Sequence, residues 1–411
     1  MTNIAIMGHG TVGSGVAEVL LKNDKHISLK TKDEINIKYI LDLRDFPDSP
    51  YKEKFIKDFN IILNDPEIKV VAEVMGGLNP AYEFTKSLLL AGKSVVTSNK
   101  ELVAQKGAEL LKIAEDNNVN YLFEASVGGG IPVLRPIAQC LAANELYEIQ
   151  GILNGTTNFI MTKMVNDGIS FDEALSLAQQ NGYAEKDPTA DIEGHDACRK
   201  ICILAALAFG KHVYPKDVYA EGITKITSAD IAYANFANCH VKLIGRAKLT
   251  KEGKCIATVY PAFVSNDNQL AHVHGVYNAI NVYGDAIGNV MFYGPGAGKL
   301  PTASAVVADI IDCVKHLHTR KYLSWDDADS SYIADYKDDT VRLYVRLTAK
   351  NDRLSVKTNA EKLFGEIKVL GRNGEQEQEL AFITPFASER ELDKLLGKLK
   401  DCEIISTMRL I

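Results

Sequence analysis

Several features that define large classes of protein are missing from this sequence. Its seven cysteines include no C-x-x-C pair, and the two nearest, Cys198 and Cys202, stand one helical turn apart. We interpret these two as buried thiols on one helix face, without a metal or redox role. No stretch approaches the roughly 18 uninterrupted apolar residues of a membrane span, and the N-terminus "MTNIAIMGHG" does not resemble a secretory signal. The sequence therefore predicts a cytoplasmic protein that does not enter a membrane.

The chain also lacks an excess of positive charge. It carries 46 Lys and Arg against 53 Asp and Glu, and its formal net charge is -7. Binding to nucleic acid or to an anionic membrane needs clustered Lys and Arg, so we expect a small-molecule partner instead. Hydrophobic residues make up 46% and charged residues 24%, which is typical of a folded globular protein. A length of 411 residues is enough for two or three domains.

A glycine motif opens the chain. In "NIAIMGHGTVGSGVAEVLLKN" an apolar strand at 4–7 is followed by glycines in G-x-G-x-x-G spacing and then by an apolar helical pattern. Such glycines allow a tight turn and a close approach of the backbone to a pyrophosphate, which the helix N-terminus attracts. We therefore predict a dinucleotide-binding turn that includes Gly8, Gly10, Thr11, Val12 and Gly13.

Strands and helices alternate through the rest of the first third. The apolar patterns predict strands at 37–43, 70–77, 94–100 and 121–130, and helices at 80–93 and 108–118. Regular alternation of this kind indicates an α/β fold, a doubly wound Rossmann-type sheet over residues 1–130. Ligands bind at the carboxyl ends of such strands, where this chain has polar residues and glycines.

Two residues after the second strand bear on the choice of cofactor. Asp42 and Arg44 are separated by a single leucine. An acid at this place binds the ribose 2'-hydroxyl of NAD, whereas an arginine meets the 2'-phosphate of NADP. The choice between NADP and NAD therefore stays open, with a preference for NADP because of Arg44.

Six stretches together resemble one family. They are "GHGTVGSGV", "VVTSNKELVA", "FEASVGGGIPV", "GILNGTTNFI", "GYAEKDPTADIEGHDACRK" and "FYGPGAGKLPTASAVVADIIDCV". Their order and sequence closely resemble homoserine dehydrogenase from residue 1 to about residue 320. The resemblance implies reversible hydride transfer between NAD(P)H and L-aspartate 4-semialdehyde, which gives L-homoserine for the biosynthesis of threonine, methionine and isoleucine.

Two lysines are candidate catalytic residues. Reducing an aldehyde requires a donor beside the oxygen that becomes negative and a group that delivers a proton. Lys200 follows Asp196 by one turn if "HDACRKICILAALAFG" is helical, so the two side chains share a face. From the residues alone, a surface ion pair is an equally good interpretation. The resemblance implies that Lys200 donates and accepts the proton, and that Lys100 is a second active-site lysine.

Acids near Lys200 are candidates for binding the substrate, whose ammonium group needs carboxylates. By the resemblance these are Glu185, Asp191 and Asp196, with Glu185 the first choice for a direct contact. Asp187 and Glu193 fit solvated positions equally well. The backbone of "GPGAG" at 294–298 is expected near the cofactor or substrate. Beyond the glycine turn, the resemblance implies cofactor contacts at Arg44, Gly76, Ser98, Lys100, Gly182, Gly296 and Gly298.

A cation site is also implied. "FEASVGGG" resembles the family's site for a monovalent cation such as sodium, with the carboxylate of Glu124 and the backbone oxygens of Val127, Gly129 and Ile131 as ligands. Histidines are not expected to bind metal. His272 and His274 alternate as on a strand, as His316 and His318 would if extended, but neither pair has further ligands in a recognisable spacing.

The C-terminal part has a different pattern. Residues 323–339 are acidic and Ser-rich and indicate a linker. Residues 340–411 predict strands at 340–349, 380–386 and 402–411 and helices at 358–367 and 388–400, with Ser388 and Glu391 as a capping box. This order resembles an ACT domain. Asp352, Arg353 and Leu354 stand where that module usually has a Pro-Gly turn, so we predict a role in oligomerisation ahead of threonine sensing.

These interpretations give a domain plan. We expect a dinucleotide-binding domain at 1–130, with helix 301–318 packing back on it, and an α+β catalytic and dimerisation domain at 131–322. A small ACT-like α+β domain at 340–411 follows the linker, and the assembly is expected to be a homodimer or homotetramer. Two alternatives are an enzyme for another amino-acid aldehyde or keto acid and a non-catalytic sensor, which the intact Lys100 and Lys200 disfavour.

Overall fold

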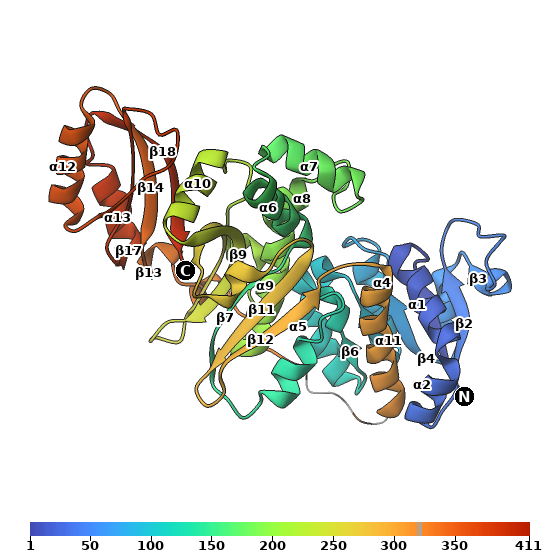
Figure 1. The fold of residues 1–411 in the computed structure, drawn as a ribbon. Helices are drawn as coiled ribbons and strands as arrows, with labels where there is room; N and C mark the ends of the chain where they lie inside the picture. Colours follow the sequence, from blue (N-terminus) through green and yellow to red (C-terminus); the bar gives the residue numbers. More distant parts are fainter. Residues whose placement is uncertain (318, 320–322) are drawn as a thin grey trace. The chain divides into compact units, whose positions relative to one another are not determined.

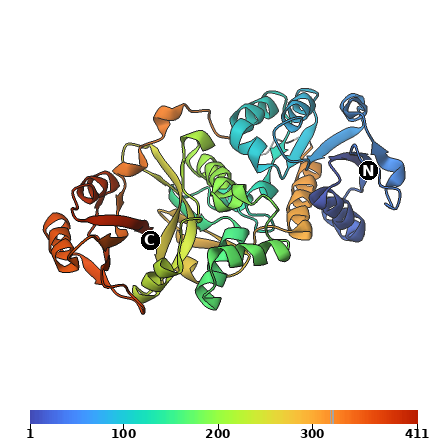
Figure 2. The ribbon, with the colours of Figure 1, turned by 90° about the horizontal axis from the view of Figure 1, so that it is seen from above.

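The computed structural model describes residues 1–317, 319 and 323–411 and divides into two compact units (Figures 1 and 2). The first unit comprises Met1–Tyr147, Cys202–Lys216 and Val282–Ser330. The second comprises Glu148–Ile201, Asp217–Asn281 and Ser331–Ile411. None of the helices in the described part of the chain combines the length and the apolar character needed to cross a bilayer.

A parallel sheet of six strands forms the centre of the first unit. Its order is β3-β2-β1-β4-β5-β6, and every neighbouring pair runs parallel. This order is that of a doubly wound sheet, in which the chain changes direction beside β1. The predicted doubly wound Rossmann-type sheet is therefore confirmed. The strands are β1 (Thr2–Met7), β2 (Ile35–Leu41), β3 (Phe55–Ile56), β4 (Ile68–Glu73), β5 (Ser94–Thr97) and β6 (Tyr121–Leu122).

Apolar side chains fill both faces of this sheet. Ile4 of β1 and Val96 of β5 on one face, and Ala5 of β1 and Val95 of β5 on the other, are all 0% exposed. The crossover connections between parallel strands carry α1 (Thr11–Lys22), α4 (Ala81–Leu90) and α5 (Lys100–Asp116), and such helices cover the faces of a sheet. Each fully buried Val or Ile side chain contributes about 1.5–3 kcal/mol, so this core dominates the stability of the unit.

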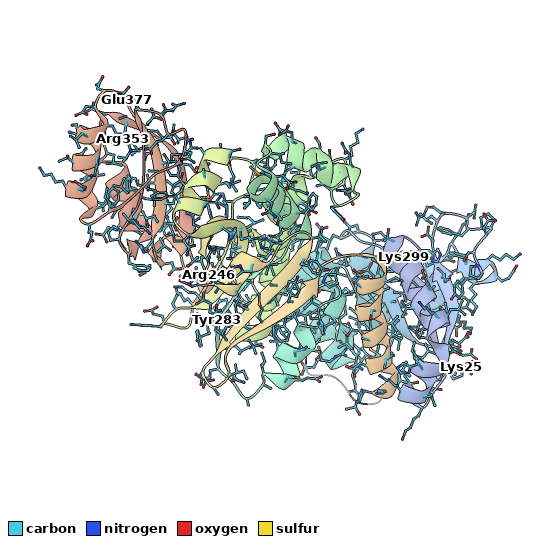
Figure 3. All side chains as sticks on the ribbon, viewed as in Figure 1. Lys25, Arg246, Tyr283, Lys299, Arg353 and Glu377 are labelled. Atoms are coloured by element: carbon cyan, nitrogen blue, oxygen red, sulfur yellow. The ribbon has the colours of Figure 1, made fainter. Side chains whose placement is uncertain are left out.

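A helix from late in the chain completes the first unit. α11 (Lys299–Lys315) lies beside α1 in Figure 1, and Figure 3 marks Lys299 at its start. A Cβ on Gly15 would lie 2.9 Å from the Lys299 carbonyl oxygen and 3.0 Å from Ala303 Cβ, so the two helices approach closely only because residue 15 is glycine. Val306 and Ile310 of α11 join the core around β1.

Three of the predicted strands are shorter in the structure. β4 ends at Glu73 rather than at residue 77, β5 ends at Thr97 rather than at 100, and β6 ends at Leu122 rather than at 130. In each case the polar residues and glycines at the predicted strand end leave the sheet. Gly76 and Gly77 take φ angles of 81° and 71°, which no strand residue adopts.

α5 begins at Lys100, well before the start predicted at residue 108. The side-chain oxygen of Asn99 accepts the Leu102 N–H at 3.1 Å, which caps the helix at this point. Gly107, one residue before the predicted start, is a packing residue within the helix. A Cβ on Gly107 would lie 2.7 Å from the ring of Trp325, the chain's single tryptophan.

The second unit is built on a mixed sheet. Its strands follow the order β11-β7-β9-β10-β18-β14-β16-β15, with β8 beside β10. The central pair β9 and β10 is a long antiparallel ladder. The strands are β7 (Leu146–Ile152), β8 (Tyr219–Ala220), β9 (Cys239–Leu249), β10 (Cys255–Ser265), β11 (Tyr277–Gly284), β14 (Leu343–Ala349), β15 (Lys368–Leu370), β16 (Glu379–Ile383) and β18 (Cys402–Leu410). β12 (Gly288–Pro295) belongs to the first unit.

Residues 340–411 form a layered part of this unit. The short pair β13 (Thr340–Val341) and β17 (Ala387–Ser388) flanks it, and α12 (Arg353–Phe364) and α13 (Glu389–Leu396) pack on β14 and β16. β18 lies parallel to β10, with Ala262 opposite Arg409, so these strands extend the sheet of the second unit. α12 begins earlier than the predicted residue 358 because Asp352 accepts the N–H groups of Leu354 and Ser355 at its start.

Two further expectations meet the structure here. The segment 323–339, predicted as a linker, includes the buried side chains of Trp325 and Tyr332, and Trp325 donates a hydrogen bond to His212 at 2.8 Å. The prediction that His272 and His274 alternate along a strand is wrong, because His272 ends a 3-10 turn that Asn268 caps. The expectation for His318 lies outside the described residues.

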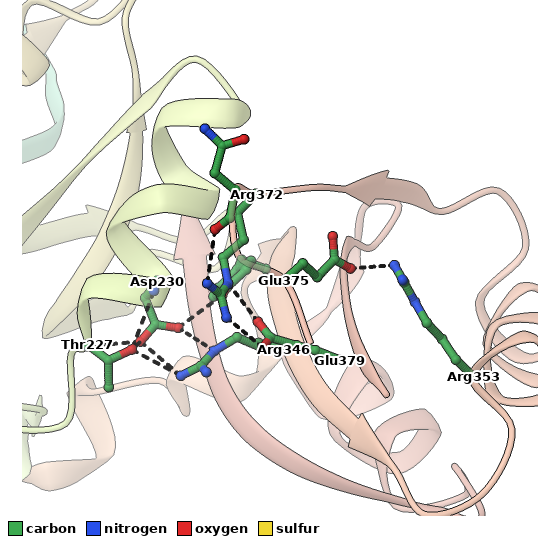
Figure 4. Close-up of polar contacts among 9 residues, drawn as sticks. Thr227, Asp230, Arg346, Arg353, Arg372, Glu375 and Glu379 are labelled. Carbon is green, nitrogen blue, oxygen red and sulfur yellow. Dashed lines mark hydrogen bonds and ion pairs between the residues drawn. The ribbon is translucent and has the colours of Figure 1, made fainter. Parts of the chain in front are cut away.

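A buried ion pair joins α10 (Ser228–Phe236) to the C-terminal strands (Figure 4). Asp230 is 0% exposed and accepts hydrogen bonds from Arg346 Nε at 3.0 Å and the Tyr344 hydroxyl at 2.9 Å. The Thr227 hydroxyl donates to the other carboxylate oxygen at 2.6 Å. Removing two charges from water is costly, and the cost is offset only while each buried group keeps its partners. Removal of Arg346 or of Asp230 therefore leaves the desolvation cost of the other charge without compensation.

We predict that Arg346→Ala lowers the free energy of unfolding by about 3–5 kcal/mol, because it leaves the Asp230 carboxylate buried without its cation. Urea unfolding followed by circular dichroism measures this change. Lys337→Ala is the matched control, since Lys337 pairs with Asp393 at 2.7 Å in a half-exposed place, and the control changes stability by less than about 1 kcal/mol. Equal losses in the two variants would contradict the prediction.

Candidate active site

The turn between β1 and α1 brings backbone atoms very close together. Gly8 has a φ of 96°, and a Cβ on Gly13 would lie only 1.9 Å from the Gly8 carbonyl oxygen. A Cβ on Gly10 would meet no described atom within 4 Å, so open space lies beside this residue. Thr11 and Val12 form the first turn of α1, whose unpaired N–H groups favour an anion. The turn has the close backbone and the open N-terminus that a pyrophosphate needs.

Asp42 and Arg44 form one unit at the end of β2. Both carboxylate oxygens of Asp42 accept from the Arg44 side chain, at 3.0 Å from Nε and 2.9 Å from Nη2. The same carboxylate accepts the His9 N–H of the glycine turn at 2.7 Å. The Arg44 guanidinium holds the pKa of Asp42 well below its usual range. Asp42 therefore supports both the turn and Arg44, whose side chain is 63% exposed.

The ends of β4 and β5 carry the next group of predicted residues. Gly76 lies in the turn after β4, Ser98 follows β5 and is half-buried, and Lys100 is the first residue of α5. Asn99 joins these segments, because its side-chain Nδ2 donates to the Gly77 carbonyl at 2.6 Å. All of these residues belong to the first unit and lie at the carboxyl ends of its parallel strands, as predicted for a nucleotide site.

Two glycine segments pack backbone against backbone in the same unit. A Cβ on Gly129 would lie 2.3 Å from the Gly296 carbonyl oxygen, and the Gly130 N–H donates to the Pro295 carbonyl at 3.2 Å. Gly298, with a φ of 126°, stands just before α11. The structure thus brings the "GPGAG" segment to the loop predicted to bind a cation, and a Cβ at Gly129 would collide with the backbone of that segment.

Glu124, predicted as a cation ligand, is buried and already hydrogen-bonded. Its carboxylate accepts the N–H groups of Val133 at 2.6 Å, Leu134 at 2.8 Å and Arg135 at 2.8 Å. The Glu124 N–H in turn donates to Asp309 of α11 at 2.8 Å. The carboxylate therefore fixes the loop from 124 to 135. Val127 and Ile131, whose backbone oxygens were predicted as ligands, are buried in this loop.

Lys200 and Asp196 form a buried pair near the start of α9 (His195–Phe209), in the part of the helix that belongs to the second unit. Their side chains are 2.8 Å apart, and the two residues are 7% and 4% exposed. Lys200 Nζ also donates to the Leu153 carbonyl at 2.8 Å. The predicted contact along the helix is present. Because the pair is buried, it differs from exposed ion pairs, which contribute only a few tenths of a kcal/mol to stability.

Asn154 is a site residue that the sequence analysis missed. Its Nδ2 donates to Asp191 at 2.7 Å and to Asp196 at 2.9 Å, so one amide links two of the predicted substrate acids. Its Oδ1 accepts the Thr157 N–H at 2.8 Å and so caps α6 (Gly155–Asp167). The cap was readable in "GILNGTTNFI", but the partners lie about forty residues away along the chain.

The remaining predicted residues of the acidic stretch lie at the surface of the second unit. The Glu185 side chain is exposed, and Gly182 turns the chain after α7 (Phe171–Gln180) with a φ of 71°. Asp187 accepts the Thr189 hydroxyl at 2.6 Å just before α8 (Thr189–Ile192), and Glu193 accepts the Thr224 hydroxyl at 3.2 Å. Asp187 and Glu193 thus have local structural partners.

Together, these features define the class of protein. A doubly wound sheet with a glycine turn after its first strand holds a dinucleotide, and a buried lysine beside carboxylates suits proton transfer at an amino-acid alcohol. The protein is therefore an NAD(P)-dependent oxidoreductase. Family models agree, since the NAD-binding domain of homoserine dehydrogenase matches residues 8–124 and the homoserine dehydrogenase model matches residues 132–311.

Known proteins identify the family. The homoserine dehydrogenase of Synechocystis sp. is 43% identical over 76% of this chain and 73% of its own length. A homoserine dehydrogenase structure from Thiobacillus denitrificans has a TM-score of 0.89 at 32% identity and covers 100% of this chain and 98% of that chain. A hyperthermophilic archaeal homoserine dehydrogenase in complex with NADPH has a TM-score of 0.64 at 29% identity, over 76% of this chain and 97% of that chain.

The chain belongs to the homoserine dehydrogenase family, and the resemblance found in the sequence motifs is confirmed. It catalyses the reversible NAD(P)-dependent interconversion of L-homoserine and L-aspartate 4-semialdehyde, an oxidoreduction at a CH-OH group in the biosynthesis of threonine, methionine and isoleucine. Its substrates are small molecules, as the charge distribution predicts.

We predict that Asn154→Ser lowers kcat/KM for L-homoserine by roughly 10- to 100-fold, because two acids lose their shared donor and shift within the site. Serine keeps a capping oxygen for α6, so the melting temperature changes little. Ser170→Ala is the control, since Ser170 caps α7 by accepting the Glu173 N–H at 3.3 Å. That variant loses stability without loss of kcat/KM. Unchanged kinetics in Asn154→Ser would remove Asn154 from the site.

Proposed function

We propose that Lys200 accepts the hydroxyl proton of L-homoserine during oxidation and returns it during reduction. The observation that carries this proposal is the burial of Lys200, with its Nζ 2.8 Å from Asp196 and 2.8 Å from the Leu153 carbonyl. A buried ion pair is weak evidence for stability, because desolvation offsets most of its attraction. A lysine held in this way within an apolar helix is better explained by chemistry.

The roles of the other groups follow from the charges of the substrate. NADP or NAD, when bound, takes up the hydride that leaves the substrate carbon. Carboxylates suit the substrate ammonium, so Asp191, Asp196 and Glu185 are its proposed partners, with Asn154 aligning the first two. Lys100, at the positive N-terminal end of α5, is the proposed donor to the substrate oxygen as negative charge develops there.

We propose NADP as the preferred cofactor. The binding of NADPH by the archaeal homoserine dehydrogenase supports this proposal, as does the commitment of Asp42 to Arg44 and His9. With Asp42 so occupied, Arg44 is the group at the end of β2 that offers charge to a 2'-phosphate. The proposed contacts are Gly8, Gly10, Thr11, Val12, Gly13, Arg44, Gly76, Ser98, Lys100, Gly182, Gly296 and Gly298.

We propose a monovalent cation such as sodium in the loop from Glu124 to Ile131. Because the Glu124 carboxylate already accepts three N–H groups, we expect the backbone oxygens of Val127, Gly129 and Ile131 to supply most of the ligands. Activity that is the same in sodium and choline salts would count against this site.

We propose that the enzyme works in the cytoplasm as a homodimer or homotetramer. Tyr147, Ile287 and Tyr293 are 47%, 46% and 56% exposed, and the ring of Tyr147 lies 6.3 Å from that of Tyr283. Apolar side chains that adjoin one another at the surface are typical of association sites.

We propose the domain plan of 1–130, 131–322 and 340–411, with residues 340–411 as an ACT-like module for assembly. A monomeric mass by light scattering would reject the assembly, and inhibition by threonine would reject the limited role of residues 340–411.

We predict that Lys200→Met lowers kcat by roughly 10²- to 10⁴-fold, the range lost when a general acid-base group is removed. NADP reduction at 340 nm with L-homoserine measures this, and fluorescence titration shows an unchanged Kd for NADPH. Lys163→Met is the control, because Lys163 pairs with Asp167 at 2.8 Å on the surface of α6. A normal kcat in Lys200→Met would remove the proton-transfer role.

We predict that Arg44→Ala raises the KM for NADPH by roughly 10- to 100-fold, which corresponds to the loss of one or two charge-assisted hydrogen bonds. The KM for NADH changes far less, because NADH has no 2'-phosphate. Lys25→Ala, on the surface of α2 (Asp24–Thr31; Figure 3), controls for the loss of one positive charge. Equal changes for both cofactors in Arg44→Ala would contradict the 2'-phosphate contact.

A further inference from the structure

Glu73, the last residue of β4, is a buried acid that the proposed mechanism does not use. It is 0% exposed, at the carboxyl end of a central strand of the parallel sheet. Burial raises the pKa of this carboxyl group, because removal from water destabilises its charged form. Fully buried acids are rare unless they are paired, and Glu73 therefore requires an explanation in its contacts.

The contacts of Glu73 are hydrogen-bond donors from the two strand ends that carry predicted site residues. Its Oε1 accepts the Met75 N–H at 2.8 Å, from the turn that contains Gly76. Its Oε2 accepts the Thr97 hydroxyl at 2.7 Å, from the end of β5. The Thr97 oxygen itself accepts the Asn99 N–H at 2.9 Å, so Thr97 links Glu73 to the residue that precedes α5.

Asn99 connects this chain of hydrogen bonds to Lys100. Its Nδ2 donates to the Gly77 carbonyl at 2.6 Å, which ties the turn after β4 to the turn after β5. Its Oδ1 accepts the Leu102 N–H at 3.1 Å, which sets the first turn of α5. Met75, Gly77, Thr97 and Asn99 thus form a network around Glu73, and the helix that begins with Lys100 starts from it.

The chemistry of this network requires an acceptor at residue 73. The Met75 N–H donates to Oε1 at 2.8 Å, and the Gly76 N–H and the Asn99 NH₂ group also donate to this carboxyl group and oppose the rise in its pKa. None of these three groups can accept instead, whereas the Thr97 hydroxyl can either donate or accept. An amide at residue 73 has the same shape, but its single oxygen accepts two hydrogen bonds at most, so one of the three donors is left facing its NH₂ group. A buried donor without an acceptor is unfavourable, so the turns would shift to relieve the contact.

We propose that Glu73 is a positioning residue of the dehydrogenase, which fixes the turn at Gly76 and the start of α5 at Lys100 relative to each other. Glu73 acts through Met75, Thr97 and Asn99 and does not touch the substrate. The inference rests on the proposed roles of Gly76 in cofactor binding and of Lys100 in catalysis. It adds a second group of residues on which the reaction geometry depends.

The test compares Glu73→Gln with Thr97→Val and Thr97→Ser. We expect Glu73→Gln to lower kcat/KM for L-homoserine by roughly 10- to 100-fold and to raise the Kd for NADPH, because the site is displaced while the volume of the core is kept. Thr97→Val removes one donor and gives a loss in the same direction. Thr97→Ser keeps the hydroxyl and recovers most of the activity lost in Thr97→Val.

A stability control separates positioning from a merely structural role. Thr85 of α4 is also 0% exposed, and its hydroxyl has no hydrogen-bond partner within the described part of the chain. Thr85→Val therefore keeps normal kcat/KM and Kd. The double variant Glu73→Gln/Thr97→Val should lose no more activity than the worse single variant, since both act through one network.

Two outcomes overturn the proposal. The first is that Glu73→Gln lowers the melting temperature but leaves kcat/KM for L-homoserine and the Kd for NADPH normal, both per folded molecule. The other is full additivity of the two losses in the double variant. Lys100→Met, measured beside them, distinguishes this failure from failure of the proposed function. Normal kcat in Lys100→Met rejects the role of Lys100, whereas a loss there with normal Glu73→Gln rejects only the positioning role.

Discussion

A buried carboxylate loses its hydrogen bonds to water and needs hydrogen-bond donors from the protein in their place. Much of this structure depends on that constraint. Glu73 recovers them from two strand ends, and Glu124 from three consecutive N–H groups of a loop. Asp230 recovers them from Arg346, Tyr344 and the cap of its own helix. Glu73 and Asp230 connect segments that are distant in the sequence, whereas Glu124 closes its own loop. Each of these contacts fixes a turn, a loop or a helix start.

The same constraint explains the pair at the centre of the proposed chemistry. Asp196 accepts from both Asn154 and Lys200, so its charge is compensated within the protein before any substrate binds. An ammonium group held in this way keeps a defined position, which proton transfer to the alkoxide oxygen formed during aldehyde reduction requires. The exposed acids of the same stretch, Glu185 and Asp187, have no comparable burial and are free of this constraint.

Asp42 and the C-terminal part illustrate two further consequences. Both carboxylate oxygens of Asp42 accept hydrogen bonds from the glycine turn and from Arg44. The charged group that remains for a cofactor at the end of β2 is therefore the arginine. In the C-terminal part, Asp352 caps α12 at the place where a Pro-Gly turn was missing from the sequence. In both places a single carboxylate decides how the following residues are presented.

The fold class and the family were determined by the sequence itself, because glycine spacing and the alternation of strands and helices are local patterns that few folds share. The acidic stretch and its lysine also placed Asp196 and Lys200 on one helix face. Only the tertiary structure showed that Asn154 joins Asp191 to Asp196, that α5 starts at Lys100, and that Glu73 lies beneath this start. These facts depend on hydrogen-bond partners from distant segments and on burial, and neither is visible within a short stretch of chain.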